Sequence, residues 1–135
     1  MPPPKIAKLL SQIIGVLLVL ACFLTFLPNP ILGEDGAFAA DTGHAILLAA
    51  FGVILLAFST KGESTAAMGL WGVAMLCLAA AILGWNELSS RPFGKASVFG
   101  VVLFNRADIW LHLSLAGTLV VGGFLNTARH QVIRD

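Results

Sequence analysis

Four long apolar segments constrain the fold of this chain more than any other feature. They cover residues 9–27, 42–60, 65–85 and 109–128, and each approaches or exceeds the roughly 20 residues that a helix needs to cross a bilayer. Charged residues make up 11% of the 135 residues, against about 25% in a soluble domain. We therefore expect one all-α membrane domain, a bundle of four transmembrane helices embedded in the lipid bilayer.

The connections between these segments predict how the helices are arranged. Pro28 and Pro30 end the first segment, because a proline disfavours helical geometry in the residue before it. The short turn from Lys61 to Ser64 makes the second and third helices antiparallel neighbours. The longest connection joins the third and fourth helices and contains an apolar stretch at 96–104. Nine residues are too few to cross as a helix, so this stretch is predicted to lie along the membrane interface or against the bundle.

Basic residues predict the orientation of the bundle. With the N-terminus in the cytoplasm, five of them lie inside and three outside: Lys5, Lys8, Lys61, Arg129 and Arg134 against Arg91, Lys95 and Arg106. This bias favours an orientation with both termini cytoplasmic. The formal net charge of +1 argues against a nucleic-acid partner, which needs a concentrated basic surface.

The two halves of the chain resemble each other. Aligning Gly15 with Gly72 superposes the first and third segments and brings Asn29 opposite Asn86, while the second and fourth segments align at His44 and His112. Each histidine is preceded by a phenylalanine and an aspartate and followed by small residues. The sequence therefore predicts two repeated helical hairpins, related by an axis along the membrane normal.

Asp41 and His44, and likewise Asp108 and His112, are the residues that could carry a function. Each pair is three or four positions apart and therefore shares one face of a helix. In the favoured interpretation the aspartates cap the helix starts, and each histidine bonds to its carboxylate or to a loop carbonyl. This interpretation is favoured because acidic residues at helix starts are common.

The alternative interpretation makes His44 and His112 a pair of axial ligands. Helices two and four lie diagonally in a simple bundle, so imidazoles at matching depth could face each other across a haem or a chlorophyll. Asp41 and Asp108 would then orient the second ring nitrogen of each ligand. Small residues beyond each histidine would leave room for a porphyrin, and its propionates would meet a nearby cation: Arg91, Lys95 or Arg106. Two histidines specify no particular ligand, so no cofactor and no metal site is predicted outright.

Catalysis and transport have less support. The chain lacks the motifs of serine hydrolases, zinc proteases and phosphate-binding loops. A transport path normally places ionisable residues at mid-membrane depth, and the four segments are nearly free of them.

Small residues and tryptophans complete the prediction. Gly69, Gly72 and the Gly122-Gly123 pair allow close helix approach, and Trp85 and Trp110 read as interfacial anchors. The leading hypothesis is a non-enzymatic accessory or scaffold subunit that packs against other membrane-protein subunits of a larger inner-membrane complex. The alternatives are a haem- or (bacterio)chlorophyll-binding component for electron transfer or light harvesting, and a small transporter.

The start of the last segment reads Asn105-Arg-Ala-Asp108-Ile-Trp-Leu-His112 and follows Val98-Phe-Gly-Val-Val. Together with Asp41-Thr-Gly-His44 and the four-segment plan, this motif resembles a bacterial family of small four-helix membrane proteins of unknown function. The resemblance covers most of the chain. It implies an integral membrane protein with paired histidines, and it implies no activity.

Overall fold

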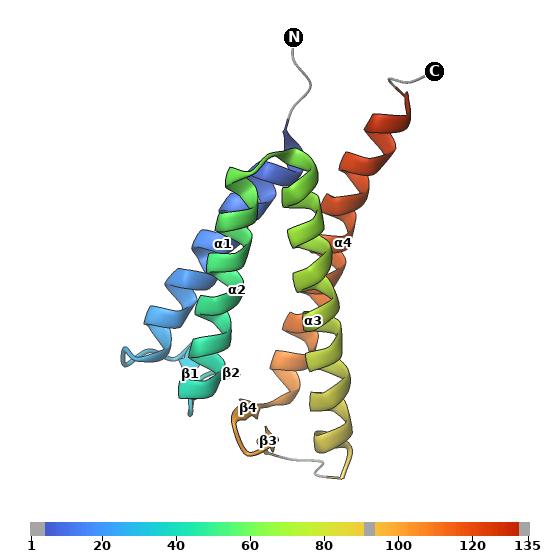
Figure 1. The fold of residues 1–135 in the computed structure, drawn as a ribbon. Helices are drawn as coiled ribbons and strands as arrows, with labels where there is room; N and C mark the ends of the chain where they lie inside the picture. The colour runs from blue at the N-terminus through green and yellow to red at the C-terminus, as the bar shows by residue number, and fades with distance from the viewer. Residues whose placement is uncertain (1–4, 91–93, 133–135) are drawn as a thin grey trace.

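The computed structural model describes residues 5–90 and 94–132, with side chains described as far as Leu125. It contains four helices, α1 (Ile6–Thr25), α2 (Thr42–Thr60), α3 (Glu63–Ser89) and α4 (Arg106–Val132), shown in Figure 1. All four are long and apolar enough to cross a membrane. The predicted all-α bundle of membrane-spanning helices is therefore confirmed.

The helix bounds differ from the predicted segments in three of the four helices. Only α2 matches the prediction, while α1, α3 and α4 begin earlier. The end of α3 also lies beyond Trp85, at Ser89. Polar residues after Trp85 end the apolar run but not the helix, because none of them is a proline or a glycine.

The helices pair as two hairpins, α1 with α2 and α3 with α4 (Figure 1). The α2–α3 turn is tight: Lys61 caps α2, and Gly62, at a φ of +124°, leads directly into α3. Glu63 then accepts hydrogen bonds from the backbone N–H groups of Ala7 at 2.6 Å and Lys8 at 3.1 Å. One carboxylate thus satisfies two of the free N–H groups at the start of α1.

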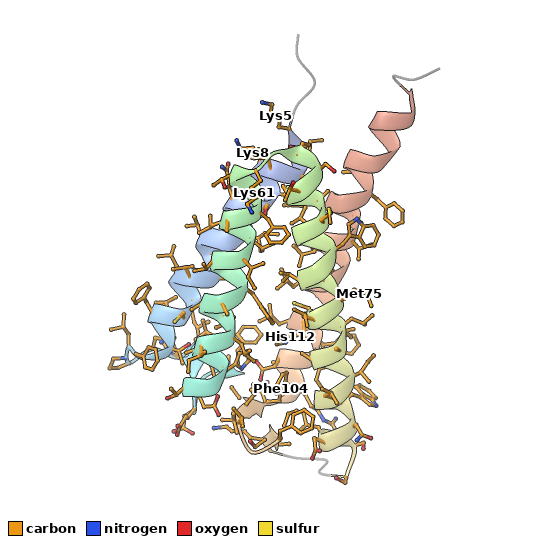
Figure 2. All side chains as sticks on the ribbon, viewed as in Figure 1. Lys5, Lys8, Lys61, Met75, Phe104 and His112 are labelled. Carbon is orange, nitrogen blue, oxygen red and sulfur yellow. The ribbon has the colours of Figure 1, made fainter. Side chains whose placement is uncertain are left out.

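The start of α1 and the C-terminal end of α4 lie at the same end of the bundle (Figure 1). Lys5, Lys8 and Lys61 gather at this end (Figure 2), and Lys95 and Arg106 belong to the segments at the other. The other three basic residues used to predict the orientation lie outside the described side chains: Arg91, Arg129 and Arg134.

Small residues hold the two helices of the first hairpin, α1 and α2, together. A Cβ atom added to Gly52 of α2 would lie 2.7 Å from the carbonyl oxygen of Gly15 in α1. The buried Ser11 hydroxyl also donates to the carbonyl of Leu55 across the same pair, at 2.8 Å. Gly52 was expected to leave room for a porphyrin beyond His44. That expectation is wrong, because the backbone of α1 occupies this space.

Two pairs of short strands precede α2 and α4. β1 (Leu32–Gly33) pairs in parallel with β2 (Phe38–Ala39), and β3 (Ala96–Val98) pairs antiparallel with β4 (Val102–Phe104). The apolar stretch at 96–104 therefore forms a β-hairpin that packs against α3 and α2. Its three-residue turn, 99–101, has positive φ at both Phe99 (55°) and Gly100 (69°).

Each half of the chain is therefore a helix, two short strands and a second helix, in agreement with the predicted repeat. The predicted equivalence of Asn29 and Asn86 is wrong. Asn29 organises the loop after α1, where its side chain bonds to the backbone of Leu24 and Leu32, whereas Asn86 lies within α3.

Candidate functional site

Three aromatic rings meet where the strands adjoin the bundle. The ring centroids of His44 and His112 are 5.6 Å apart, and Phe104 lies 5.4 Å from the first and 5.3 Å from the second. Figure 2 shows Phe104 and His112 between α2 and α3, near the end that carries β3 and β4. The two histidines, one from each half of the chain, therefore lie close together, as expected.

His44 is fixed by the start of α2 and by β4. Asp41 is the N-cap of α2, and its Oδ1 accepts from the backbone N–H of His44 at 2.8 Å. The His44 ring is 5% exposed, with Nδ1 3.0 Å from the carbonyl oxygen of Ala39 and 3.2 Å from that of Leu103. Asp41 therefore caps the helix, as the favoured interpretation predicted, and backbone carbonyls orient the ring.

His112 follows the same rule. Its Nδ1 lies 2.7 Å from the backbone carbonyl oxygen of Asp108, one turn earlier in α4. Backbone carbonyls therefore contact the two Nδ1 atoms, in the place proposed for the Asp41 and Asp108 carboxylates. One oxygen of each carboxylate, Oδ1 of Asp41 and Oδ2 of Asp108, accepts from backbone N–H groups near the helix starts.

Asp108 links the two halves of the protein. Asn105, which precedes α4, accepts from the N–H of Asp108 at 3.0 Å, and Asp108 Oδ2 accepts from the N–H of Asn105 at 2.7 Å. This is the reciprocal arrangement of a capping box. The same Oδ2 accepts from the N–H of Ala39 at 3.1 Å. Asn105 extends the link, because its amide donates to the carbonyl of Ala37 at 2.9 Å.

The contacts of both Nδ1 atoms fix the tautomers of His44 and His112. A carbonyl oxygen can only accept, so each Nδ1 carries a proton and donates it. In a neutral imidazole the other nitrogen, Nε2, then presents a lone pair. Neither Nε2 has a hydrogen-bond partner among the side chains that the structure describes. Each ring therefore offers one acceptor, and the two ring centroids lie 5.6 Å apart.

Both histidines line a cavity of about 260 Å³. Its wall is otherwise apolar apart from the Cys77 thiol, and it is built by all four helices and the β3–β4 hairpin: Leu18, Leu48, Phe51, Cys77, Val98 and Leu115 are among the lining residues. Leu47 of α2 and Leu76 and Leu83 of α3 also line it and are 38–48% exposed. The cavity therefore opens sideways between α2 and α3, towards the lipid.

A tetrapyrrole does not fit this geometry. The cavity is smaller than the 300–1,000 Å³ range typical of drug-sized ligands, and a porphyrin is larger than most of these. Phe104 also packs against both imidazoles, so the rings frame no open slot between them. Two of the expected propionate partners lie elsewhere: Lys95 pairs with Asp35, and Arg106 lines a separate hollow. Arg91 lies outside the described residues.

No known protein family, curated protein or solved structure matches the chain.

Sequence reasoning missed Phe104, and it predicted a carbonyl partner for His44 without identifying Ala39 and Leu103 as the residues that supply it. The aligned phenylalanines, Phe38 and Phe104, were a usable signal for the first of these. The carbonyl contacts left no signal, because they depend on how β2 and β4 approach the start of α2.

Proposed function

We propose that this membrane protein binds a lipid-soluble molecule by its hydroxyl group, in the cavity between α2 and α3, and performs no reaction on it. The observation that carries the proposal is the pair of imidazoles of His44 and His112, 5.6 Å apart in the lining of a largely apolar cavity, each with its Nδ1 engaged by a backbone carbonyl. Pockets that bind small molecules share this plan, an apolar wall with a few polar groups that fix the orientation.

The chemistry of the site selects the kind of ligand. Each imidazole is taken in its neutral form, with the Nδ1 proton donated to a backbone carbonyl. Its Nε2 then needs a donor, which a phenol, a quinol or a long-chain alcohol provides and a hydrocarbon does not. The side opening between α2 and α3 would let such a molecule enter from the bilayer, with its apolar part against the exposed leucines.

A binding experiment with paired probes tests the proposal. The purified protein in nanodiscs is titrated with a benzoquinol that carries a decyl tail and with the corresponding dimethyl ether, which keeps the ring and the tail but has two methoxy groups in place of the hydroxyl donors. We expect the quinol to bind about fivefold to tenfold more tightly, the equivalent of one hydrogen bond of about 1 kcal/mol. Equal binding of the two probes, or no binding of either, would overturn the proposal.

Variants assign the acceptor. His112→Phe keeps an aromatic ring and removes Nε2, and its lost Nδ1 bond is local to α4. We expect this variant to lose the preference for the quinol while its thermal unfolding stays close to that of the parent protein. Met75→Leu, on the exposed surface of α3, is the matched control and should bind both probes as the parent does.

A second candidate function is that of an accessory subunit in a larger bacterial inner-membrane complex, with both termini in the cytoplasm. It is favoured by an outward stripe of small residues on α4, formed by Ser114, Gly117 and Thr118, which are all exposed. A Cβ atom added to Gly117 would meet nothing within 4 Å, so this glycine is not needed within the bundle. Small residues on an outer face allow a second membrane helix to approach closely.

Gentle purification tests this second candidate. A partner subunit should co-purify with the parent protein and be lost from Gly117→Leu, whereas Gly72→Leu on α3 serves as the control. A lone monomer under these conditions would contradict it.

A further inference from the structure

Two hollows adjoin each other on the outer surface between α3 and α4, away from the histidine cavity. The larger, of about 370 Å³, lies where α3 ends and α4 begins, and is lined by Trp85, Leu88, Ser89, Arg106, Ile109 and Trp110. The smaller, of about 190 Å³, is lined by Ala81, Ile82, Trp85, Ile109 and Leu113. Because Trp85 and Ile109 line both, the two hollows form one continuous groove.

The polarity of this groove changes along its length. The hollow at the helix ends contains the Arg106 guanidinium and the Ser89 hydroxyl, whereas the other is lined only by apolar side chains and Trp85. Trp85 and Trp110 are 62% and 64% exposed. Tryptophans with this exposure at the ends of spanning helices are typical of the headgroup level of a bilayer. The groove thus runs from the headgroup level towards the hydrocarbon core.

Arg106 is the cation in this groove that can bind an anion. It is the first residue of α4, where the helix dipole adds positive potential. Within the part of the chain whose side chains are described, it forms no ion pair, because the one ion pair found there joins Lys95 and Asp35. The neighbouring acidic residue, Asp108, is fully buried and turned towards Ala39 and Asn105.

We propose that this groove binds one anionic phospholipid, with its phosphate at Arg106 and one acyl chain along Ile82 and Leu113. Guanidinium groups bind phosphate oxygens through a planar fork of N–H donors, which suits this position. The two tryptophans would flank the glycerol region, where amphipathic rings are most stable. The apolar hollow would hold the chain next to the headgroup.

Quenching of tryptophan fluorescence tests the proposal in the intact protein. The protein, carrying Trp71→Phe to remove the third tryptophan, is placed in phosphatidylcholine vesicles. A small fraction of the lipid carries brominated chains, either as phosphatidylglycerol or as phosphatidylcholine. One arginine near the membrane surface contributes about 1 kcal/mol, so we expect about fivefold stronger occupancy by the anionic lipid.

Three further arms make the result specific. Arg106→Gln should reduce quenching by the anionic lipid to the phosphatidylcholine level, whereas Lys95→Gln, which removes a cation from the same end of the bundle, should not change it. Equal quenching by both lipids, or a preference retained in Arg106→Gln, would overturn the proposal. Loss of the preference on adding millimolar inorganic phosphate at constant ionic strength would also overturn it, because the groove would then hold free phosphate.

Discussion

Asp108 and Ala39 lie 69 positions apart in the sequence and share a hydrogen bond of 3.1 Å. The acceptor, Oδ2 of Asp108, also receives the N–H of Asn105 at 2.7 Å. A single buried carboxylate oxygen therefore fixes the start of α4 to the strand that precedes α2. Since these two helices carry His112 and His44, this bond sets how the two imidazoles lie relative to each other.

We expect Asp108→Ala to lower the free energy of unfolding by about 2–4 kcal/mol, because it leaves the N–H groups of Ala39 and Asn105 without an acceptor. Asp108→Asn retains an amide oxygen in the place of Oδ2 and should lose much less. Thermal unfolding in detergent compares the two variants. Equal stability of Asp108→Ala and Asp108→Asn would contradict the role assigned to this oxygen.

Gly43→Ala should displace the β3–β4 hairpin. The added Cβ would collide with the backbone carbonyl of Val101, which cannot rotate away as a side chain can. We expect a loss of about 1–3 kcal/mol in unfolding free energy, together with weaker quinol binding, because Leu103 in the same hairpin orients His44. Gly72→Ala is the control: a Cβ there meets nothing within 4 Å, and alanine favours the helix. If Gly43→Ala were as stable as Gly72→Ala, the expected collision would be refuted.

Asp35 and Lys95 give a prediction about pH. Lys95 Nζ donates to Asp35 Oδ1 at 2.8 Å and also to the carbonyl of Glu34, and its hydrogen bond and charge hold the pKa of Asp35 below the ordinary 3.8. The lowered pKa means that this link is fully present above pH 3.8 and is lost as the pH falls through the lower, folded value. In Lys95→Gln the pKa of Asp35 should rise towards 3.8. A carboxyl carbon NMR titration measures it, and an unchanged midpoint would show that the pair does not persist in solution.

Phe99 occupies a backbone conformation that costs about 1–2 kcal/mol in a residue with a bulky side chain. It is 82% exposed and lines the histidine cavity. Asparagine tolerates positive φ, so Phe99→Asn should leave the protein as stable or slightly more stable while weakening quinol binding. Thermal unfolding and the quinol titration are measured on the same sample. If Phe99→Asn were less stable and bound the quinol as tightly as the parent protein, Phe99 would contribute to folding and not to binding, contrary to this prediction.

The helices could be predicted from the sequence because crossing a bilayer requires a continuous run of about 20 apolar residues, which is visible in the sequence itself. Asp41 as the cap of α2, the tight turn at Gly62 and the packing role of Gly69 all follow from short-range patterns and the sizes of side chains. The surroundings of the histidines could not be predicted in the same way. Backbone carbonyls of β2 and β4 orient the His44 ring, and a carbonyl acceptor leaves no mark on residue type.

The β-hairpin at 96–104 is a second feature that could be predicted only in part from the sequence. Its apolar residues fitted a segment that lies against the bundle, and Gly100 supplied one of its two positive φ values. The other belongs to Phe99, a residue type that argues against such a turn. The hairpin forms because Phe104 and Val98 become buried against α3 and α4, which is a long-range effect.

The contact between Glu63 and the start of α1 has a consequence for synthesis. The ribosome makes the first helix and the whole of the second before it adds Glu63, which binds the backbone N–H groups of Ala7 and Lys8. Until then the leading end of the nascent chain has no such acceptor from the later segments. The first hairpin therefore acquires its final form only when the third segment enters the membrane, which couples the order of insertion to the order of assembly.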